Sequence, residues 1–154
     1  MMKTVQLAND QFLPIVHELV MEGSHVSIIA KGNSMRPFLE SNRDVAVLSK
    51  ADAFRVYDVV LAEIAKGIYV LHRIDRIVTP DGQVHKDLVN DPEAHITLRG
   101  DGNVRGTEEC RLKDIRAIAR QFVRKGKTWN TDTRFWRCYS RIWRKLLPVR
   151  RYLS

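Results

Sequence analysis

Short runs of β-branched and aromatic residues, separated by turns, recur through most of this chain and constrain its fold more than any other feature. The clearest runs occupy residues 25–30, 44–49, 57–64, 68–74, 83–89 and 95–100. A Pro-Asp-Gly turn stands at 80–82, and residues 114–123 fit either a strand or a helix by pattern alone. Many short strands predict a mainly β fold, here a small, coiled, β-barrel-like domain.

One short helix is expected before these strands, over residues 10–22. Its apolar residues recur at helical spacing and are Phe12, Val16, Leu19 and Val20. Pro14 is tolerated only in a first turn, and Gly23 is placed as a C-terminal stop. The length of 154 residues and the hydrophobic fraction of 44% suit one packed core. We expect a domain over residues 1–125 and a basic tail over 126–154.

Three segments supply, in order, the residue types that serine chemistry requires. Ser34 lies in GNSMRPFL at 32–39, His72 in LHRI at 71–74, and Asp101 in LRGDGN at 98–103. A serine nucleophile needs a base and a group that orients the base. Ser34, His72 and Asp101 are therefore the candidate catalytic residues.

These segments resemble, in the same order, the sequence boxes of signal peptidase I-like serine peptidases, a superfamily that includes self-cleaving repressors. GNSMRPFL resembles the nucleophile box, YDVVLAEI at 57–64 and YVLHRI at 69–74 the next two, and RGDGN at 99–103 the last. The resemblance covers about residues 20–125 and implies a serine endopeptidase that cleaves a leader or precursor peptide. It also implies that residues 114–123 form a returning strand. His72 stands at the base position, as in the endoplasmic-reticulum-type and archaeal-type members, where bacterial housekeeping members have lysine.

Strand alternation supports His72 as a base without the resemblance. In residues 68–74 it places His72 on one face with Val70 and Ile74, and burial there favours the neutral imidazole. Asp75 would face away, whereas Asp101 lies on a Gly-flanked turn that can present its carboxylate to His72. Taken alone, His72 would more often be a core histidine bonded to a backbone carbonyl.

The serine box suits an acyl-transfer site. Gly32 allows an unusual backbone conformation, and Pro37 keeps the segment extended. Backbone N–H groups of Gly32 and Ser34 would bind the oxyanion of the tetrahedral intermediate. We expect Met35 and Pro37 to contact the substrate.

Two lysines compete with His72 for the role of base. Lys31 and Lys66 are the nearest to the boxes in sequence.

Several other classes of function find no support. Cys110 and Cys138 are too few and too far apart for a disulfide scaffold or a zinc site, and we expect reduced thiols. No metal-ligand spacing, P-loop or dinucleotide fingerprint is present, so we expect no metal and no cofactor. The N-terminal residues lack the apolar core of a secretory signal, and no apolar stretch reaches the length of a spanning helix. These features predict a cytoplasmic protein, peripheral at the membrane if its tail binds lipid.

The net positive charge belongs entirely to the tail region. Residues 120–154 hold eleven Lys and Arg residues and one Asp, a net charge of +10, so the other 119 residues carry −2 of the total +8. A helix over 134–147 would gather apolar residues on one face: Phe135, Trp136, Tyr139, Ile142, Trp143, Leu146 and Leu147. Basic residues would line the other face: Arg137, Arg141, Arg144 and Lys145. The apolar face could pack on the β domain or bind an anionic membrane surface; nucleic acid or an acidic protein is less favoured.

Two rival functions stay open beside the peptidase. One is a repressor-like regulator, which the sequence disfavours because residues before 25 hold too little for a two-helix DNA-binding motif. The other is a binding module that keeps the fold without catalysis.

Overall fold

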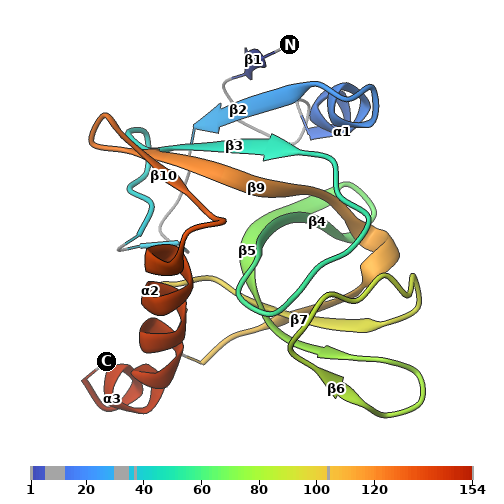
Figure 1. The fold of residues 1–154 in the computed structure, drawn as a ribbon, viewed down its shortest axis with the longest axis vertical. Helices are drawn as coiled ribbons and strands as arrows, with labels where there is room; N and C mark the ends of the chain where they lie inside the picture. The colour runs from blue at the N-terminus through green and yellow to red at the C-terminus, as the bar shows by residue number, and fades with distance from the viewer. Residues whose placement is uncertain (1, 6–12, 30–34, 37, 104, 154) are drawn as a thin grey trace.

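A single curved β-sheet dominates the computed structural model, which describes residues 2–5, 13–29, 35–36, 38–103 and 105–153 (Figure 1). The elements in chain order are β1 (Met2–Val5), α1 (Leu13–Met21), β2 (His25–Ile29), β3 (Val45–Ser49), β4 (Val59–Ala65), β5 (Ile68–Val78), β6 (Val84–His85), β7 (His95–Arg99), β8 (Glu108–Arg111), the 3₁₀ turn η1 (Leu112–Asp114), β9 (Ile115–Arg124), β10 (Lys127–Asn130), α2 (Arg134–Lys145) and α3 (Leu147–Leu153). The predicted mainly β fold with flanking helices is confirmed.

The strands pair in the order β1-β2-β3-β9-β4-β5-β7-β8, with β10 added to β9 and β6 to β5. The β1–β2 pair is parallel, and the other pairs are antiparallel. Strand β9 lies between β3 and β4 and so joins the two halves of the sheet. Residues 114–123, ambiguous by pattern, therefore form the returning strand that the resemblance implied.

Several strands differ from the sequence expectation. Strand β1 was not predicted, and β5 continues to Val78, past the expected end at residue 74. Only Val84 and His85 of the run at 83–89 pair as a strand. Strand β8 carries charged residues and was not predicted. Strand β10 forms a hairpin with β9 through Lys125 and Gly126, whose φ angles are 50° and 79°. Positive φ at both turn residues is the geometry of a tight hairpin, so residues 127–130 belong to the sheet.

Helix α1 (Leu13–Met21) lies within the predicted range of residues 10–22, of which residues 10–12 are outside the described residues. Pro14 lies in the first turn, and Gly23 follows the helix with φ of 92°. The Gly23 N–H donates to the Val20 carbonyl at 2.9 Å, so the glycine closes the helix end. In the described ranges, none of the helices combines the length and the apolar character needed to cross a bilayer.

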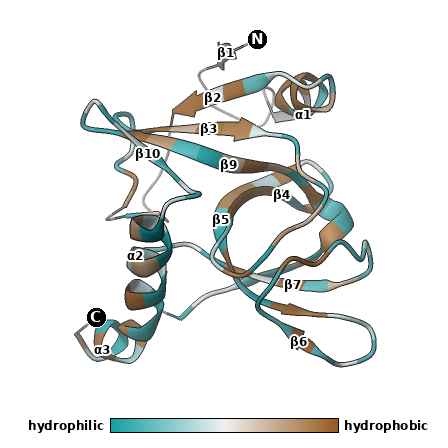
Figure 2. Cartoon of the chain, viewed as in Figure 1, coloured by the Kyte–Doolittle hydropathy of each residue, from teal (hydrophilic) through white to brown (hydrophobic). Residues whose placement is uncertain are grey.

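Two hydrophobic clusters cover the two faces of the sheet, because successive strand residues point to opposite sides. The first cluster contains Val16 of α1, Met35, Phe38, Leu61, Phe122 and Trp136 of α2. The second contains Phe54, Val60, Ile74, Ile77, Leu98 and Ile118. Helix α2 thus packs on the first face, beside β9 and β10 (Figure 1), and hydrophobic residues alternate with hydrophilic ones along it (Figure 2).

Candidate active site

The segment that follows the candidate nucleophile packs against the turn that carries Asp101. Ser34, Gly32 and Pro37 lie outside the described residues, as does Lys31. Met35 comes directly after Ser34, and its sulfur accepts a hydrogen bond from the Asp101 N–H at 3.4 Å. The Met35 side chain is 5% exposed and belongs to the first cluster. The side chain therefore packs in the interior, and the predicted contact of Met35 with a substrate stays a prediction.

Asp44 holds the same segment from its other end. Its buried carboxylate accepts hydrogen bonds from the Arg43 side chain at 2.8 and 3.0 Å and from the Glu40 N–H at 2.8 Å. The Lys125 N–H donates to it at 3.3 Å from the β9–β10 turn. Burial alone would raise the pKa of Asp44, but these hydrogen bonds outweigh burial and lower it. The carboxylate therefore stays ionised and ties residues 38–44 to β3 and β9.

His72 lies in the middle of β5, where it is 6% exposed and pairs with Val60 of β4. Its Nδ1 forms a short hydrogen bond with Oε1 of Glu108, at the start of β8. Strand register explains the contact: Ile74 pairs with Leu98, and Leu98 with Glu108, so Glu108 and His72 share one face. The Glu108 side chain is 24% exposed, which leaves this end of the pair open to solvent.

Asp101 binds Arg73 rather than His72. Its carboxylate accepts two parallel hydrogen bonds from the guanidinium, from Nε and Nη2, each at 2.8 Å. Arg73 follows His72 on β5, so its side chain points to the opposite face of the sheet. This corrects the expectation that Asp101 orients His72. Glu108 bonds His72 on one side of β5, and Asp101 bonds Arg73 on the other.

The sequence contains a signal for Glu108, which lies outside the three boxes. Glu108 follows the strand at 95–99 after a Gly-containing turn, as an antiparallel partner does. An acidic residue on such a neighbouring strand can face His72 if the register places it there. Register depends on the turn, which includes residue 104, and sequence alone did not define it.

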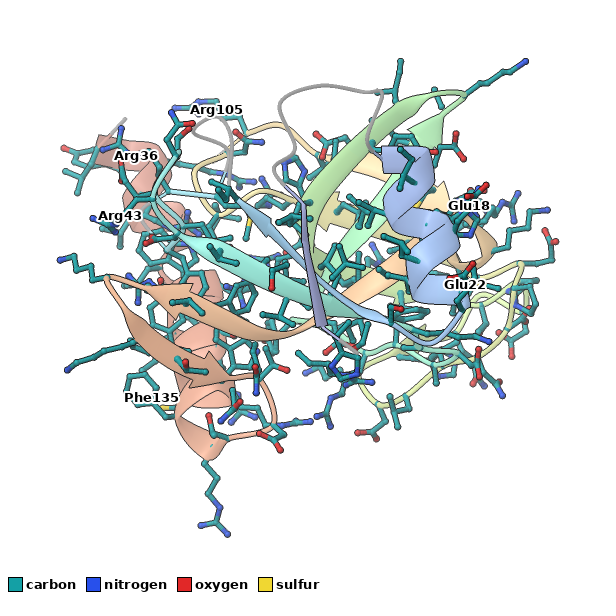
Figure 3. All side chains as sticks on the ribbon, turned by 90° about the horizontal axis from the view of Figure 1, so that it is seen from above. Glu18, Glu22, Arg36, Arg43, Arg105 and Phe135 are labelled. Atoms are coloured by element: carbon teal, nitrogen blue, oxygen red, sulfur yellow. The ribbon has the colours of Figure 1, made fainter. Side chains whose placement is uncertain are left out.

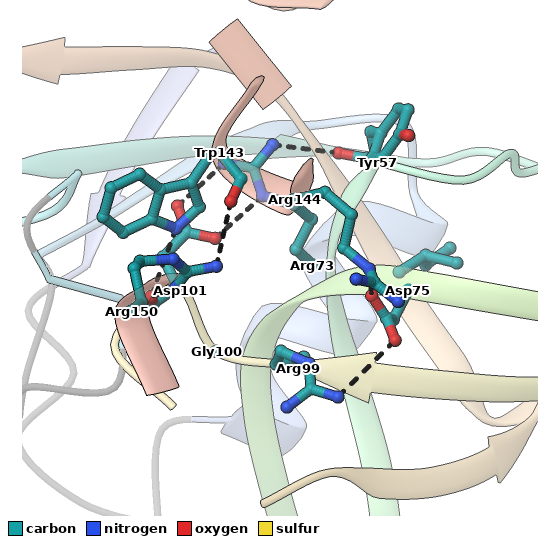
Figure 4. A pocket seen from close by; sticks show the side chains of 10 residues that line it. Tyr57, Arg73, Asp75, Arg99, Gly100, Asp101, Trp143, Arg144 and Arg150 are labelled. Atoms are coloured by element: carbon teal, nitrogen blue, oxygen red, sulfur yellow. Dashed lines mark hydrogen bonds and ion pairs between the residues drawn. The ribbon is translucent and has the colours of Figure 1, made fainter. Parts of the chain in front are cut away.

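The C-terminal helices close over the Arg73–Asp101 pair (Figure 4). The Trp143 indole N–H donates to the Asp101 carbonyl at 3.2 Å, and Nη1 of Arg150 donates to the same oxygen at 2.9 Å. The Arg73 guanidinium lies 4.6 Å from the Trp136 ring centre and also bonds the buried Ser140 hydroxyl. Trp136, at 3% exposed, is therefore part of the core and faces the domain.

The hollow beside this pair is too small for a peptide. It has a volume of about 20 Å³ and is bounded by β5, β7 and the helices α2 and α3. Such a volume accommodates about one water molecule.

The other candidates for a base or a ligand lie elsewhere. Lys66 is exposed in the turn between β4 and β5, roughly 15–20 Å along the strand from His72 at the usual rise per residue. His85 bonds the Thr79 hydroxyl at 2.8 Å in the β5–β6 hairpin. Among the residues the structure describes, no group of three or more His, Cys, Asp or Glu side chains is gathered as metal ligands would be.

Comparison with known proteins adds no relative to this picture. The chain matches no protein-family model, no curated protein and no solved structure, so the argument for its function rests on its own sequence and geometry.

Proposed function

We propose that this chain is a serine endopeptidase in which Ser34 is the nucleophile, His72 the general base and Glu108 the carboxylate that orients the base. The single observation that carries the proposal is the hydrogen bond between His72 Nδ1 and Glu108 on one face of β5. The resemblance of the serine, histidine and aspartate boxes to signal peptidase I-like enzymes supports the same assignment of Ser34 and His72. Asp101 takes a different role from the one its box suggested.

The chemistry follows from the direction of that hydrogen bond. With Nδ1–H donating to Glu108, the proton is held on Nδ1 and Nε2 carries the free lone pair. Nε2 would accept the Ser34 proton during attack on the peptide carbonyl and return it to the leaving amine. The negative Glu108 would stabilise the imidazolium that forms between these steps. No cofactor is needed for this reaction, and the Gly32 and Ser34 N–H groups remain the predicted oxyanion donors.

The Arg73–Asp101 pair would position the serine segment without touching the substrate. Asp101 binds Arg73 through its carboxylate, Met35 through its N–H, and Trp143 and Arg150 through its carbonyl. Met35 is the neighbour of Ser34 in the chain. This network restrains the residue next to the nucleophile, from the face of β5 opposite to His72.

The substrate class is a polypeptide bound in an extended form. The hollow beside the Arg73–Asp101 pair, on the other face of β5 from His72, cannot enclose a folded or bulky ligand. An extended peptide can instead use main-chain hydrogen bonds along a strand edge. A leader or precursor peptide with an accessible cleavage segment meets this requirement.

The experiment combines covalent labelling with cleavage. The full chain is treated with a fluorophosphonate probe for activated serines and, separately, with a peptide library whose products are read by mass spectrometry. We expect label on Ser34 and cleavage products from the wild type. Ser34→Ala and His72→Ala should each remove both, and the double variant should lose no more, since such groups act as a unit.

Matched variants distinguish this mechanism from its rivals. Lys66→Met should retain full activity, because Lys66 lies at the far end of the β4–β5 hairpin. Loss of activity in Lys31→Met with full activity in His72→Ala would replace the histidine by a lysine base. Absence of labelling and cleavage in the folded wild type would overturn the peptidase and favour a non-catalytic or regulatory module.

A further inference from the structure

Helix α2 presents three strips of side chains, and one of them is buried against the domain. Residues three or four apart lie on the same side of a helix. The inward strip contains Trp136 and Ser140, both buried, and Leu147 continues it at the start of α3. The two tryptophans that the sequence suggested for a membrane are thus engaged with the domain: Trp136 is buried, and Trp143 bonds Asp101.

A second strip is apolar and exposed. Its members on α2 are Phe135, Ile142 and Leu146, and α3 also exposes Val149, Tyr152 and Leu153. Phe135 is 59% exposed, Ile142 53% and Tyr152 87%. A shallow hollow of about 200 Å³ opens along this strip, between Phe135, Cys138, Tyr139, Ile142 and Trp143. Single exposed apolar residues are ordinary, but a contiguous group marks an interaction surface.

A third strip is basic and runs beside the apolar one. It consists of Arg134, Arg137, Arg141 and Lys145, all exposed. Residues 133–154 contain seven Lys and Arg residues and no Asp or Glu. Arg36, Arg43 and Arg105 lie on the same side of the molecule, whereas Glu18 and Glu22 lie on α1 at the far side (Figure 3). This face of the molecule therefore combines exposed apolar groups with a concentrated positive charge.

We propose that the outward face of α2 and α3 docks on an anionic lipid surface. Phe135, Ile142 and Leu146 would enter the headgroup region, while Arg137 and Arg141 pair with lipid phosphates. A second copy of the chain fits this face poorly, because two surfaces rich in arginine and without carboxylates repel each other. The proposal concerns a surface separate from His72 and Glu108 and does not depend on the peptidase assignment.

Cys138 allows the docking to be measured directly. It is the exposed one of the two cysteines in the chain and lies in the apolar hollow. Burial raises the pKa of the Cys110 thiol to about 12, so Cys110 resists labelling at neutral pH. A polarity-sensitive fluorophore on Cys138 should brighten and shift to the blue with vesicles of phosphatidylcholine and phosphatidylglycerol. It should not respond to pure phosphatidylcholine. Unlabelled protein should likewise cosediment with the mixed vesicles and not with pure phosphatidylcholine.

Two variants of exposed residues test the two strips, each with a matched control. Ile142→Asp should weaken binding to the mixed vesicles by about tenfold. Met21→Asp on α1, at the same 53% exposure, should not change binding. Arg137→Glu with Arg141→Glu should weaken binding by about tenfold or more. Lys86→Glu in the β6–β7 connection should leave it unchanged, and melting temperatures should confirm that all four variants are folded.

The outcome separates a lipid from other partners. Binding that weakens as salt is raised from about 0.1 M to about 1 M, and that depends on both strips, supports the proposal. Equal binding to neutral vesicles, or equal binding by Ile142→Asp and Met21→Asp, would overturn it. So would an absence of vesicle binding together with binding to polyglutamate, which would identify an acidic polypeptide as the partner.

Discussion

His72 and Arg73 are neighbours on β5, and each binds a carboxylate, but on opposite faces of the sheet. His72 bonds Glu108, whose side chain is partly open to solvent. Arg73 and Asp101 are both buried and form two parallel hydrogen bonds. The first pair contains an imidazole, whose ring has a nitrogen lone pair that can accept a proton, whereas a guanidinium has no acceptor.

The difference shows how one strand can separate chemistry from support. Alternation places a titratable pair on one face and a permanent ion pair on the other, with only the backbone between them. The ion pair gathers the serine segment and the C-terminal helices around Asp101. Substitutions in the two pairs should therefore affect different quantities, and the predictions below test this division.

The largest effect is expected at Glu108. Glu108→Gln keeps the size of the side chain but removes its negative charge, so it should lower kcat for peptide cleavage by about 10³–10⁴-fold. The free energy of unfolding should change little. Asp101→Asn is the comparison: it should lower stability while leaving kcat per folded molecule within a few-fold of wild type. The reverse pattern would return Asp101 to the role of orienting group.

The second effect concerns the ion pair. Arg73→Leu leaves the Asp101 carboxylate buried without its partner, which should lower the free energy of unfolding by about 3–5 kcal/mol. Urea denaturation measures it. The double variant Arg73→Leu with Asp101→Leu should lose less than the sum of the two single losses. Strict additivity would mean that the two side chains are not energetically coupled.

A smaller effect is expected where the tail meets the Asp101 turn. Trp143→Phe keeps an aromatic ring but removes the N–H that donates to the Asp101 carbonyl at 3.2 Å. The loss should be about 1 kcal/mol in the free energy of unfolding. Phe135→Tyr is the control: it keeps the exposed ring that lies 5.0 Å from the Trp129 ring, and it should change stability by less than about 0.5 kcal/mol. Equal effects of the two substitutions would argue against a specific contact of Trp143.

The smallest effect is a pH dependence at Asp44. Its pKa is lowered from the ordinary 3.8, so its contribution to stability is complete above about pH 5 and is lost as pH falls through the lowered value. Burial raises the pKa of Asp58, so protonation of Asp58 favours the folded state as pH falls. This effect is the same in wild type and in Asp44→Asn, so it cancels when the two are compared. The stability difference between wild type and Asp44→Asn should therefore shrink below pH 4 in unfolding measurements. A difference that is constant between pH 6 and pH 3 would contradict this role.

Much of the fold was predictable because its signals are local. The β-branched runs, the late start of α1 at Pro14 and its end at Gly23 all depend on neighbours within a few residues. Strand β8 escaped prediction because its Glu-Glu-Cys-Arg sequence has no apolar alternation. It is a strand because β7 beside it supplies a partner, which is a tertiary effect.

The candidate site also has features that are set locally and features that are set by tertiary structure. The sequence by itself determined that His72 lies on a strand with Val70 and Ile74 on its face, since a strand alternates whatever surrounds it. Only the tertiary structure decided which acid reaches the imidazole. Asp101 and Glu108 are both near His72 in the folded sheet, but strand register places Glu108 on its face and Asp101 with Arg73.

In the tail, too, local sequence sets the type of element and tertiary contacts set which of its residues are buried. The sequence determined an amphipathic, basic helix, because charge and apolar spacing are properties of the chain itself. Which apolar residues pack and which remain exposed depended on where β9, β10 and the Asp101 turn meet the helix. Those contacts turn Trp136 inward and leave Phe135 and Ile142 at the surface, because one helix can bury only the strip that faces its partner.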